Sequence, residues 1–354
     1  MPFSSTLGTA YVVAQWTAGT AFSAGSTYNV GTGTSDSYAA LLSSTNNDFN
    51  KWKFLGNTGG NSWYTSTYSA FDAYSVNGTA TSNIAAVSPI NNYNIYGGTD
   101  SELPTAPDIV IGGEIPGTFG GHRPWVGGIP EVITYSTILN SVDQKLVENY
   151  LSSKYARSFG APANDHYLGE ASGYDEDVFG IGNDGTSSRL SSGMQGIDLT
   201  ASSLDGGDWL LAGHDGTAMG LSGDTDNRPE YISQRWNRAW YLDKTGALDA
   251  TIAFDFEDAG LTLPAPGTTF QLLYSADSNF TDGFQSLGQT NSISSGTVAF
   301  SLANASLLDG YYTLGLDTFV PEPSSMTLLL GALCCGIWRR RSPKGCKFES
   351  DFTL

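Results

Sequence analysis

The chain reads EVITY over residues 131–135 and SVDQKLVENYLSSKY over residues 141–155. In the first run, Val132 and Thr134 would lie on one face and Ile133 and Tyr135 on the other, which is the two-residue period of a β-strand. In the second run Ser141 and Gln144 have the spacing of a capping box, and apolar residues follow at helical spacing: Val142, Leu146, Val147, Tyr150, Leu151 and Tyr155. This stretch therefore predicts a strand and then one helix over about 142–155.

Short apolar or alternating runs recur elsewhere between turns rich in Gly, Ser, Thr and Asn, as in β-sandwiches and barrels. The strands predicted before the helix are Thr9–Trp16, Trp52–Leu55, Trp63–Tyr68, Phe71–Val76, Ile109–Ile111 and Val132–Tyr135. Those predicted after it are Val178–Asp184, Trp209–Ala212, Ile232–Leu242, Ala250–Phe256, Phe270–Ser275, Val298–Leu302 and Tyr311–Leu316. We therefore expect an all-β fold with one short closing helix.

A polar stretch at about 157–166 follows the predicted helix and is the expected domain boundary. On this division, residues 1–157 and 165–318 each form a β-sandwich, jelly-roll-like domain. A chain of 354 residues has room for two domains of ordinary size. A distinct segment at 320–341 and an extra tail at 342–354 complete the expected organisation.

The charge and cysteine content narrow the range of functions. The chain has 16 Lys and Arg against 35 Asp and Glu, a net charge of −19. Nucleic acid is not an expected partner, because phosphate contacts need clustered cations. The three cysteines all lie in the C-terminal tail, so the rest of the chain has no disulfide framework. The three histidines lie far apart and show no zinc-binding spacing.

The C-terminal segment is an uncharged run over residues 326–338, preceded by Val320-Pro321-Glu322-Pro323 and followed by Arg339-Arg340-Arg341. As a helix this run would be about 20 Å long, whereas a bilayer core is about 30 Å thick. Flanking serines and snorkelling arginines lengthen the span, and the arginines belong on the cytoplasmic side. We therefore expect a C-terminal transmembrane helix, with the residues before Pro321 outside the cytoplasm and residues 342–354 as an extra cytoplasmic tail. A buried core helix is the alternative, and the arginine triplet argues against it.

This order of a Pro-Glu-Pro box, an apolar helix and arginines resembles the PEP-CTERM sorting signal of exported bacterial proteins. The resemblance implies an exosortase and the export machinery as partners. It also implies an inner-membrane tail, and then a cell-surface or extracellular location. Residues 342–354 depart from the pattern, because such tails normally stop soon after the arginines. Residues 1–5 lack the basic and apolar regions of a signal peptide, so we expect an upstream extension and an N-terminally truncated first domain.

Two further resemblances concern the folded part. The runs DIVIGG at 108–113 and WVGGIPEVITY at 125–135, with the helix, resemble concanavalin A-like (laminin G-like) modules over about residues 9–156. This resemblance implies a two-sheet jelly roll closed by the helix. The runs GIGND at 180–184, LLAGHD at 210–215 and RWNRAW at 235–240 resemble a β-sandwich module that often follows the laminin G-like one in bacterial surface proteins. That second module has no assigned chemistry.

Trp236, Arg238 and Trp240 form the densest polar and aromatic group, and on a strand they would share one face. The group is either a sugar-binding platform, since aromatic faces suit pyranose rings, or core packing around a buried arginine. The acidic loops containing Asp175 with Asp177, and Asp224 with Asp226, carry oxygen ligands that suit Ca²⁺. Neither loop matches an EF-hand, and the alternative is a solvated surface loop. No other cofactor is expected.

Catalytic patterns are weak in this sequence. Concanavalin A-like glucanases carry a Glu-x-Asp-x-Glu strand, and the first region has none. Glycoside hydrolysis needs two carboxylates on one face. Asp255 and Glu257 come closest to this arrangement, because alternate residues of a strand share one face. His214-Asp215 follows an apolar strand, but a catalytic triad is defined by geometry and not by such a pair.

These patterns favour an exported, non-catalytic adhesion, glycan-binding or matrix protein, with the membrane and extracellular polysaccharide as partners. One alternative is a carbohydrate-active enzyme, a glycoside hydrolase or lyase, on the same jelly roll. The other is a structural matrix protein without a specific ligand.

Overall fold

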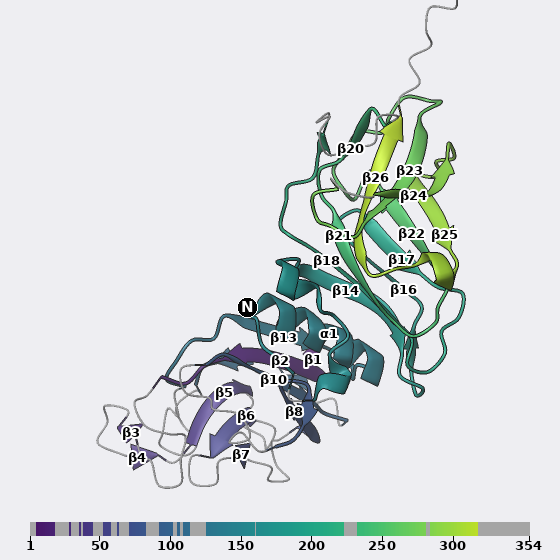
Figure 1. Cartoon of the computed structure of the whole chain (residues 1–354). Coiled ribbons are helices and arrows are strands. Elements are labelled where there is room, and N and C mark those ends of the chain that lie inside the picture. Colours follow the sequence, from purple (N-terminus) through teal and green to yellow (C-terminus); the bar gives the residue numbers. More distant parts are fainter. Residues whose placement is uncertain are drawn as a thin grey trace, which may run out of the picture.

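The computed structural model describes residues 5–17, 28–29, 35–36, 38–44, 52–57, 62–63, 71–82, 92–101, 105–106, 109–113, 125–159, 161–222, 232–280 and 284–317. Within these ranges the fold is mostly antiparallel β-structure with one α-helix, α1 (Ser141–Lys154), which confirms the expected fold class (Figure 1). Three short 3₁₀ turns accompany it: η2 (Pro162–Asn164), η3 (Gly169–Ser172) and η4 (Asn304–Ser306).

The described strands before α1 form two main sheets. One has the order β13-β2-β10-β8-β9, with β13 (Glu131–Tyr135), β2 (Thr9–Ala14), β10 (Asn94–Thr99), β8 (Ala73–Val76) and β9 (Thr79–Ala80). The other has the order β12-β5-β6-β7, with β12 (Ile109–Ile111), β5 (Tyr38–Ser44), β6 (Trp52–Asn57) and β7 (Ser62–Trp63). Two small ribbons pair β1 (Ser5–Thr6) with β11 (Thr105–Ala106), and β3 (Tyr28–Asn29) with β4 (Ser35–Asp36).

The described strands after α1 form a nine-stranded and a four-stranded sheet. The larger sheet contains β15 (Ser188–Arg189), β14 (Glu176–Asn183), β18 (Trp209–His214), β21 (Trp240–Thr245), β26 (Gly310–Asp317), β20 (Gln234–Trp236), β19 (Leu221–Ser222), β23 (Thr269–Ser275) and β24 (Gln285–Thr290). The smaller has the order β16 (Ser191–Met194), β17 (Ile197–Thr200), β22 (Ala250–Asp255) and β25 (Thr297–Leu302). No described strand before α1 pairs with one after it.

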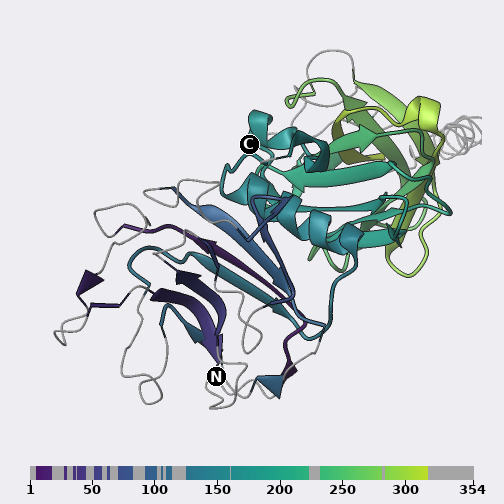
Figure 2. The ribbon, with the colours of Figure 1, turned by 90° about the horizontal axis from the view of Figure 1, so that it is seen from below.

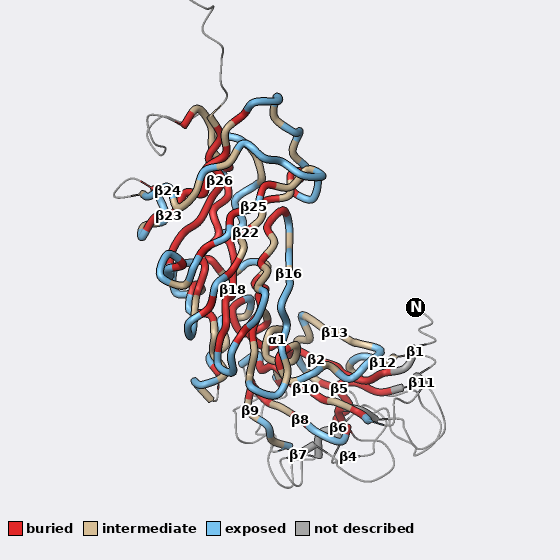
Figure 3. Tube along the Cα trace, turned by 90° about the vertical axis from the view of Figure 1, so that its right-hand side faces the viewer, coloured by how far each residue is buried: buried red, intermediate tan, exposed pale blue. Residues whose placement is uncertain are grey.

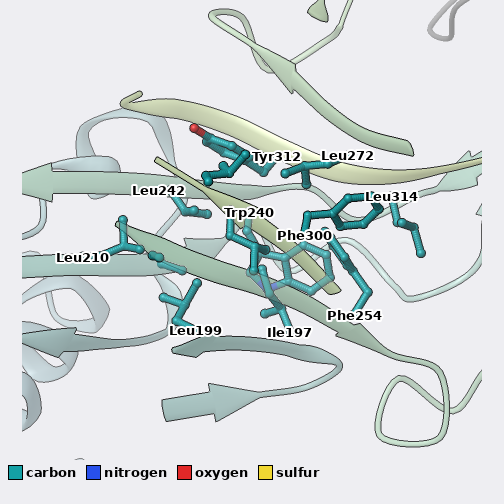
Figure 4. Close-up of a cluster of buried hydrophobic side chains, with 14 of the residues drawn as sticks. Ile197, Leu199, Leu210, Trp240, Leu242, Phe254, Leu272, Phe300, Tyr312 and Leu314 are labelled. Carbon is teal, nitrogen blue, oxygen red and sulfur yellow. The ribbon is translucent and has the colours of Figure 1, made fainter. Parts of the chain in front are cut away.

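Each set of strands encloses its own apolar core, so both halves are sandwich-like. In the second half, side chains from the nine-stranded and the four-stranded sheet meet between them, and Trp240, Phe254 and Phe300 are among them (Figure 4). Strand β22 alternates buried and half-buried residues, as expected for a strand with one face on a core. The core of the first half contains Val12, Phe54 and Tyr96.

Some strands are buried on both faces. All six residues of β2 and all six of β18 are buried, and Figure 3 shows the continuous burial along β18. One face of each strand lies on its sandwich core, and the other face lies against α1 or the segment that follows it. This double coverage explains the nearly continuous apolar runs of these strands.

The structure corrects one predicted strand. Residues 232–242 do not form a single strand, because β20 ends at Trp236 and β21 begins at Trp240. Most other predicted strands lie within two residues of the observed ones, whereas β5, β10, β16, β17 and β24 were not predicted. Four of these, β5, β10, β16 and β24, contain Gly, Ser, Ala or Asn in place of β-branched residues, so their pattern is weak. The fifth, β17, alternates apolar and polar residues, but over four positions only.

Candidate functional site: a cleft beside helix α1

Helix α1 positions the site, and its N-terminus differs from the prediction by one residue. Asn140 is the N-cap, since its side-chain oxygen accepts a 2.9 Å hydrogen bond from the N–H of Asp143. Ser141 is already helical, so the expected capping box at Ser141 and Gln144 is wrong. The Gln144 side chain instead donates to the carbonyl of Leu139 at 2.7 Å.

The helix packs against both halves of the chain. Val142 lies in a cluster with Val178 and Trp209 of the second half. On another side, Leu151 packs with Tyr11 and other residues of the first half. Figures 1 and 2 show α1 lying between the two sets of sheets. The apolar face of α1 is therefore divided between two sandwiches.

Polar contacts also join α1 to its neighbours. Lys145 forms a 3.5 Å ion pair with Asp184, and its ammonium group lies 5.6 Å from the centre of the Trp209 ring. Within the helix, the Asn149 side chain accepts a 2.8 Å hydrogen bond from the N–H of His166 and donates to the carbonyl of Asn164 at 3.0 Å. These contacts hold the connecting segment against the helix.

A cleft of about 340 Å³ opens where the two packed sides of α1 diverge. Its floor is one face of the helix at i, i+3, i+4 and i+7: Asp143, Leu146, Val147 and Tyr150. One wall is Ile133, Tyr135 and Leu139 from β13 and the loop that follows it. The opposite wall is Val178, Phe179 and Gly180 of β14, with Arg189, Ser192 and Met194 of β15 and β16. Ligand sites are common in clefts of this size between domains.

Asp143 and Arg189 of the cleft lining are paired with each other, and a second pair, Lys154 with Glu131, contacts Tyr150 of the lining. Arg189 makes two hydrogen bonds to the carboxylate of Asp143, and this contact raises the pKa of Arg189. Lys154 lies 3.0 Å from Glu131, which also accepts a 3.2 Å hydrogen bond from the Tyr150 hydroxyl. Burial raises the pKa of Tyr150, so its phenol is neutral at physiological pH.

Two titratable groups with shifted pKa values lie on or against α1, the buried Glu148 and the half-buried His166. Burial raises the pKa of Glu148 on α1 to about 7, and its carboxylate accepts a 2.7 Å hydrogen bond from Ser75. His166 stacks on Trp209 with ring centres 4.0 Å apart. Burial, with the charge of Lys145, lowers the pKa of His166 to about 4, so the ring is neutral.

The structure does not support Trp236, Arg238 and Trp240 as an exposed platform. Both tryptophans are 0% exposed and Arg238 is 6% exposed. The ring of Trp236 packs edge-on against Phe254 and Phe256 at 5.3 and 5.2 Å. Because the chain turns between Trp236 and Trp240, the three residues do not share one face of a strand. The core-packing alternative describes this group.

Arg238 belongs to a polar cluster at the end of β18. Its guanidinium donates to the carbonyl of Thr217 at 2.7 Å and to the side chain of Gln195. The Gln195 amide in turn donates to Asp177, which lies at a β-bulge with a left-handed φ of 50°. Asp177 is also 3.2 Å from His214. Asp177, one of the expected calcium ligands, therefore takes part in a hydrogen-bond network with Gln195 and His214.

His214 pairs with Asp177, and not with the adjacent Asp215. The N–H of Gly216 donates to His214 Nδ1 at 2.9 Å, so Nε2 carries the proton and donates to Asp177. Burial, and then the charge of Arg238, lower the pKa of His214. With both ring nitrogens engaged, this histidine is not positioned to accept a proton from a nucleophile.

Asp255 and Glu257 do not share a strand face, because β22 ends at Asp255 and Glu257 lies in the following turn. One oxygen of Asp255 accepts hydrogen bonds from the N–H groups of Glu257 and Asp258, and the other accepts from Thr297. These bonds give Asp255 a structural role in the turn.

Several predicted residues lie outside the described ranges. These are Asp224, Asp226, residues 64–68 of the strand predicted from Trp63, the segment 320–341 with its box and arginines, and the tail 342–354. Among the described residues, no group of three or more His, Cys, Asp or Glu side chains is arranged to hold a metal ion. In that same part of the chain, no helix has both the length and the apolar character needed to cross a bilayer.

The chain matches no family model, no curated protein and no solved structure with which it was compared. The site therefore has to be interpreted from its own geometry.

The sequence contained a signal for the cleft that the strand and helix predictions did not use. At 100° per residue, the five apolar residues of α1 span about 180° around the helix axis. A helix that covers one core needs a stripe of roughly 100°. The wider surface indicates two packing partners, and a cleft forms where the two partners separate.

Proposed function

We propose that this chain is an exported, non-catalytic surface or matrix protein, delivered to the membrane by a PEP-CTERM-type tail. The observation that carries the proposal is the order of the box at Val320–Pro323, the uncharged run and the triplet Arg339–Arg341. The box begins three residues after β26 ends at Asp317. In this proposal, residues 326–338 span the inner membrane, and an exosortase and the export machinery are the partners.

The proposal includes a finer interpretation of the fold. Residues 1–157 form a concanavalin A-like (laminin G-like) jelly roll, and residues 165–318 form a second β-sandwich. The separate pairing of strands before and after α1, each set around its own core, supports this division.

A binding role is favoured over the two alternatives. Asp255 is engaged by a turn and His214 by two neighbours, so neither supports the carbohydrate-active enzyme. The cleft beside α1 is a feature that a purely structural matrix protein does not need. The proposed role is adhesion or ligand binding at the cell surface, and it requires no cofactor.

The sorting proposal is tested by replacing Arg339, Arg340 and Arg341 together with Glu and following an epitope tag in fractionated cells. The Glu variant should lose membrane retention and processing, because the positive flank sets the orientation of the segment. The matched control replaces the same three residues with Lys, which keeps the charge and should behave like the wild type. Identical distribution of the Glu variant and the wild type, with the tail never in the membrane fraction, would refute the proposal.

A further inference from the structure

Helix α1 and the connector that follows it, residues 161–168, together form the joint between the two sandwiches. On the first sandwich, the side chain of Asn164 donates a 2.8 Å hydrogen bond to the carbonyl of Gly78, in the turn between β8 and β9. On the second sandwich, the N–H of Leu168 donates a 2.7 Å hydrogen bond to the carboxylate of Asp243 on β21. The joint is therefore held by contacts on both of its sides.

Two carboxyl groups are buried in this joint, one on each side. Glu148 of α1 is 5% exposed and faces the first sandwich, where its carboxylate accepts a 2.7 Å hydrogen bond from Ser75. Gly97 of β10 leaves room for this contact, because a Cβ at Gly97 would lie 2.3 Å from the Ser75 hydroxyl oxygen. Asp243 is 7% exposed and lies against the connector. Ionising a carboxyl group that is shielded from water costs free energy, so both sites favour the neutral form.

The groups around Glu148 do not cancel the effect of burial. Glu148 faces the ammonium group of Lys145 on α1, the hydroxyl of Ser75 on β8 and the phenol of Tyr11 on β2. Burial has the largest effect, and it raises the pKa of Glu148 to about 7 although Ser75 and Lys145 lower it. The closed joint therefore favours a neutral Glu148 below neutral pH.

The groups around Asp243 add to the effect of burial. The titratable groups described near it are acids and phenols: Asp165, Glu170, Asp309, Tyr167 and Tyr241. Burial raises the pKa of Asp243 to about 6, and the like charges of Asp309 and Asp165 add to this rise. The N–H of Leu168 lowers the pKa of Asp243, but by less than burial raises it.

One group in the connector responds to pH in the opposite direction. His166 stacks on Trp209 of β18, near the ammonium group of Lys145. Burial and this charge lower the pKa of His166 from 6.5 to about 4, so its contribution is complete above pH 6.5 and is lost as the pH falls through 4.

The two carboxyl groups outweigh this single imidazole. The contributions of Glu148 and Asp243 are complete below their ordinary pKa values of 4.5 and 3.8, and they are lost as the pH rises through about 7 and about 6 respectively. As the pH rises from 5 to 8, two groups therefore weaken the joint and one strengthens it.

We propose that α1 and the connector are a pH-sensitive joint, which holds the two sandwiches most tightly in mildly acidic surroundings and loosens as Glu148 and Asp243 ionise. The cleft lies between α1 and strands of both sandwiches, so loosening the joint releases the walls of the cleft from each other. The proposal does not depend on the sorting tail, because all of these residues belong to the folded part.

The test measures amide hydrogen exchange of the full chain in mild detergent at pH 5 and pH 8, corrected for the pH dependence of exchange in an unfolded chain. The readout is the protection of residues 161–168, compared with that of strand β22 in the core of the second sandwich, and the wild-type profile needs no variant. The double variant Glu148→Gln and Asp243→Asn removes both ionisations and keeps an oxygen that can accept each hydrogen bond. Glu257→Gln, in an exposed turn, is the control.

Residues 161–168 should be less protected than β22 at both pH values, because the joint opens without global unfolding. Their protection in the wild type and in Glu257→Gln should fall at least about tenfold from pH 5 to pH 8, since each carboxyl group shifts the opening equilibrium by up to about tenfold per pH unit. In the double variant it should no longer fall, because His166 then decides the response and favours the closed joint at pH 8.

Three results would overturn the proposal. The first is wild-type protection of residues 161–168 that is equal or higher at pH 8. The second is a fall in the double variant as large as in the wild type. The third is equal protection of residues 161–168 and β22 at both pH values, which would mean that only global unfolding exposes the connector.

Discussion

At the scale of single residues, burial places Glu148 in an unusual protonation state. Glu148 is 5% exposed, and the described hydrogen-bond partner of its carboxyl group is the hydroxyl of Ser75. Lys145 lowers the pKa of Glu148, but burial outweighs this effect and raises the pKa to about 7. At neutral pH a fraction of the carboxyl groups is protonated.

This shift predicts how stability depends on pH. Because the pKa of Glu148 is higher in the folded chain than the usual 4.5, the folded state binds the proton more tightly than the unfolded state. Its contribution to folding is complete below about pH 4.5 and is lost as the pH rises through 7. Glu148→Gln keeps an acceptor for Ser75 without the charge. At pH 8.5 it should raise the free energy of unfolding by up to about 3 kcal/mol.

The measurement is urea unfolding at pH 4.5 and pH 8.5. The gain from Glu148→Gln should shrink toward zero at the lower pH. Glu176→Gln, at an exposed glutamate, is the control and should change little at either pH. A gain of the same size at both pH values would show that ionisation of Glu148 is not its cause.

At the scale of elements, α1 is defined by its cap and by the width of its apolar surface. Asn140 satisfies the N–H of Asp143, and its own amide donates to the carboxylate of Asp143 at 2.8 Å. The basic residue Lys154 lies in the last turn, where it favours the helix dipole. The ends of the helix are thus specified locally, whereas its position depends on both sandwiches.

The cap leads to a prediction about Asn140. Asn140→Ala should lower the free energy of unfolding by about 1 kcal/mol, because the N–H of Asp143 loses its acceptor. Asn140→Ser should stay within a few tenths of the wild type, since serine is also a good N-cap. Urea unfolding followed by circular dichroism checks both variants. An equal loss for Ala and Ser would point to a contact of Asn140 other than the cap.

At the scale of the whole molecule, the two sandwiches share one helix. Val142 and Leu151 are each 0% exposed, and they pack against the second and the first half respectively. Ion pairs and the Asn149 hydrogen bonds add to this contact. The helix is therefore part of both cores and should couple the unfolding of the two halves.

The coupling predicts a single thermal transition for the folded part. Leu151→Ala should lower the free energy of unfolding by about 2–5 kcal/mol, and Val142→Ala should lower it by roughly 2 kcal/mol. Both variants should shift the same transition in calorimetry. Glu257→Ala, in an exposed turn, is the control and should leave it unchanged. Two separate transitions, each moved by only one of the variants, would contradict the coupling.

The sequence by itself determined the fold class, the α-helix of the described part and the positions of many of its strands. Strand β12, predicted at Ile109–Ile111, has those bounds in the structure. Such features are readable because the periods of strands and helices come from local backbone geometry. The predicted functions, the sorting tail and its partners remain predictions based on motifs.

Only the tertiary structure decided which groups meet. Ser75 and Glu148 are 73 residues apart in the chain, and Asp177 and His214 are 37 apart, yet each pair is in contact. Trp236 and Trp240 are as compatible with an exposed strand as with a core, and packing between two sheets buried them. The cleft likewise exists only because two sandwiches separate beside one helix. Burial and distant contacts depend on the packing of whole elements, which no local period encodes.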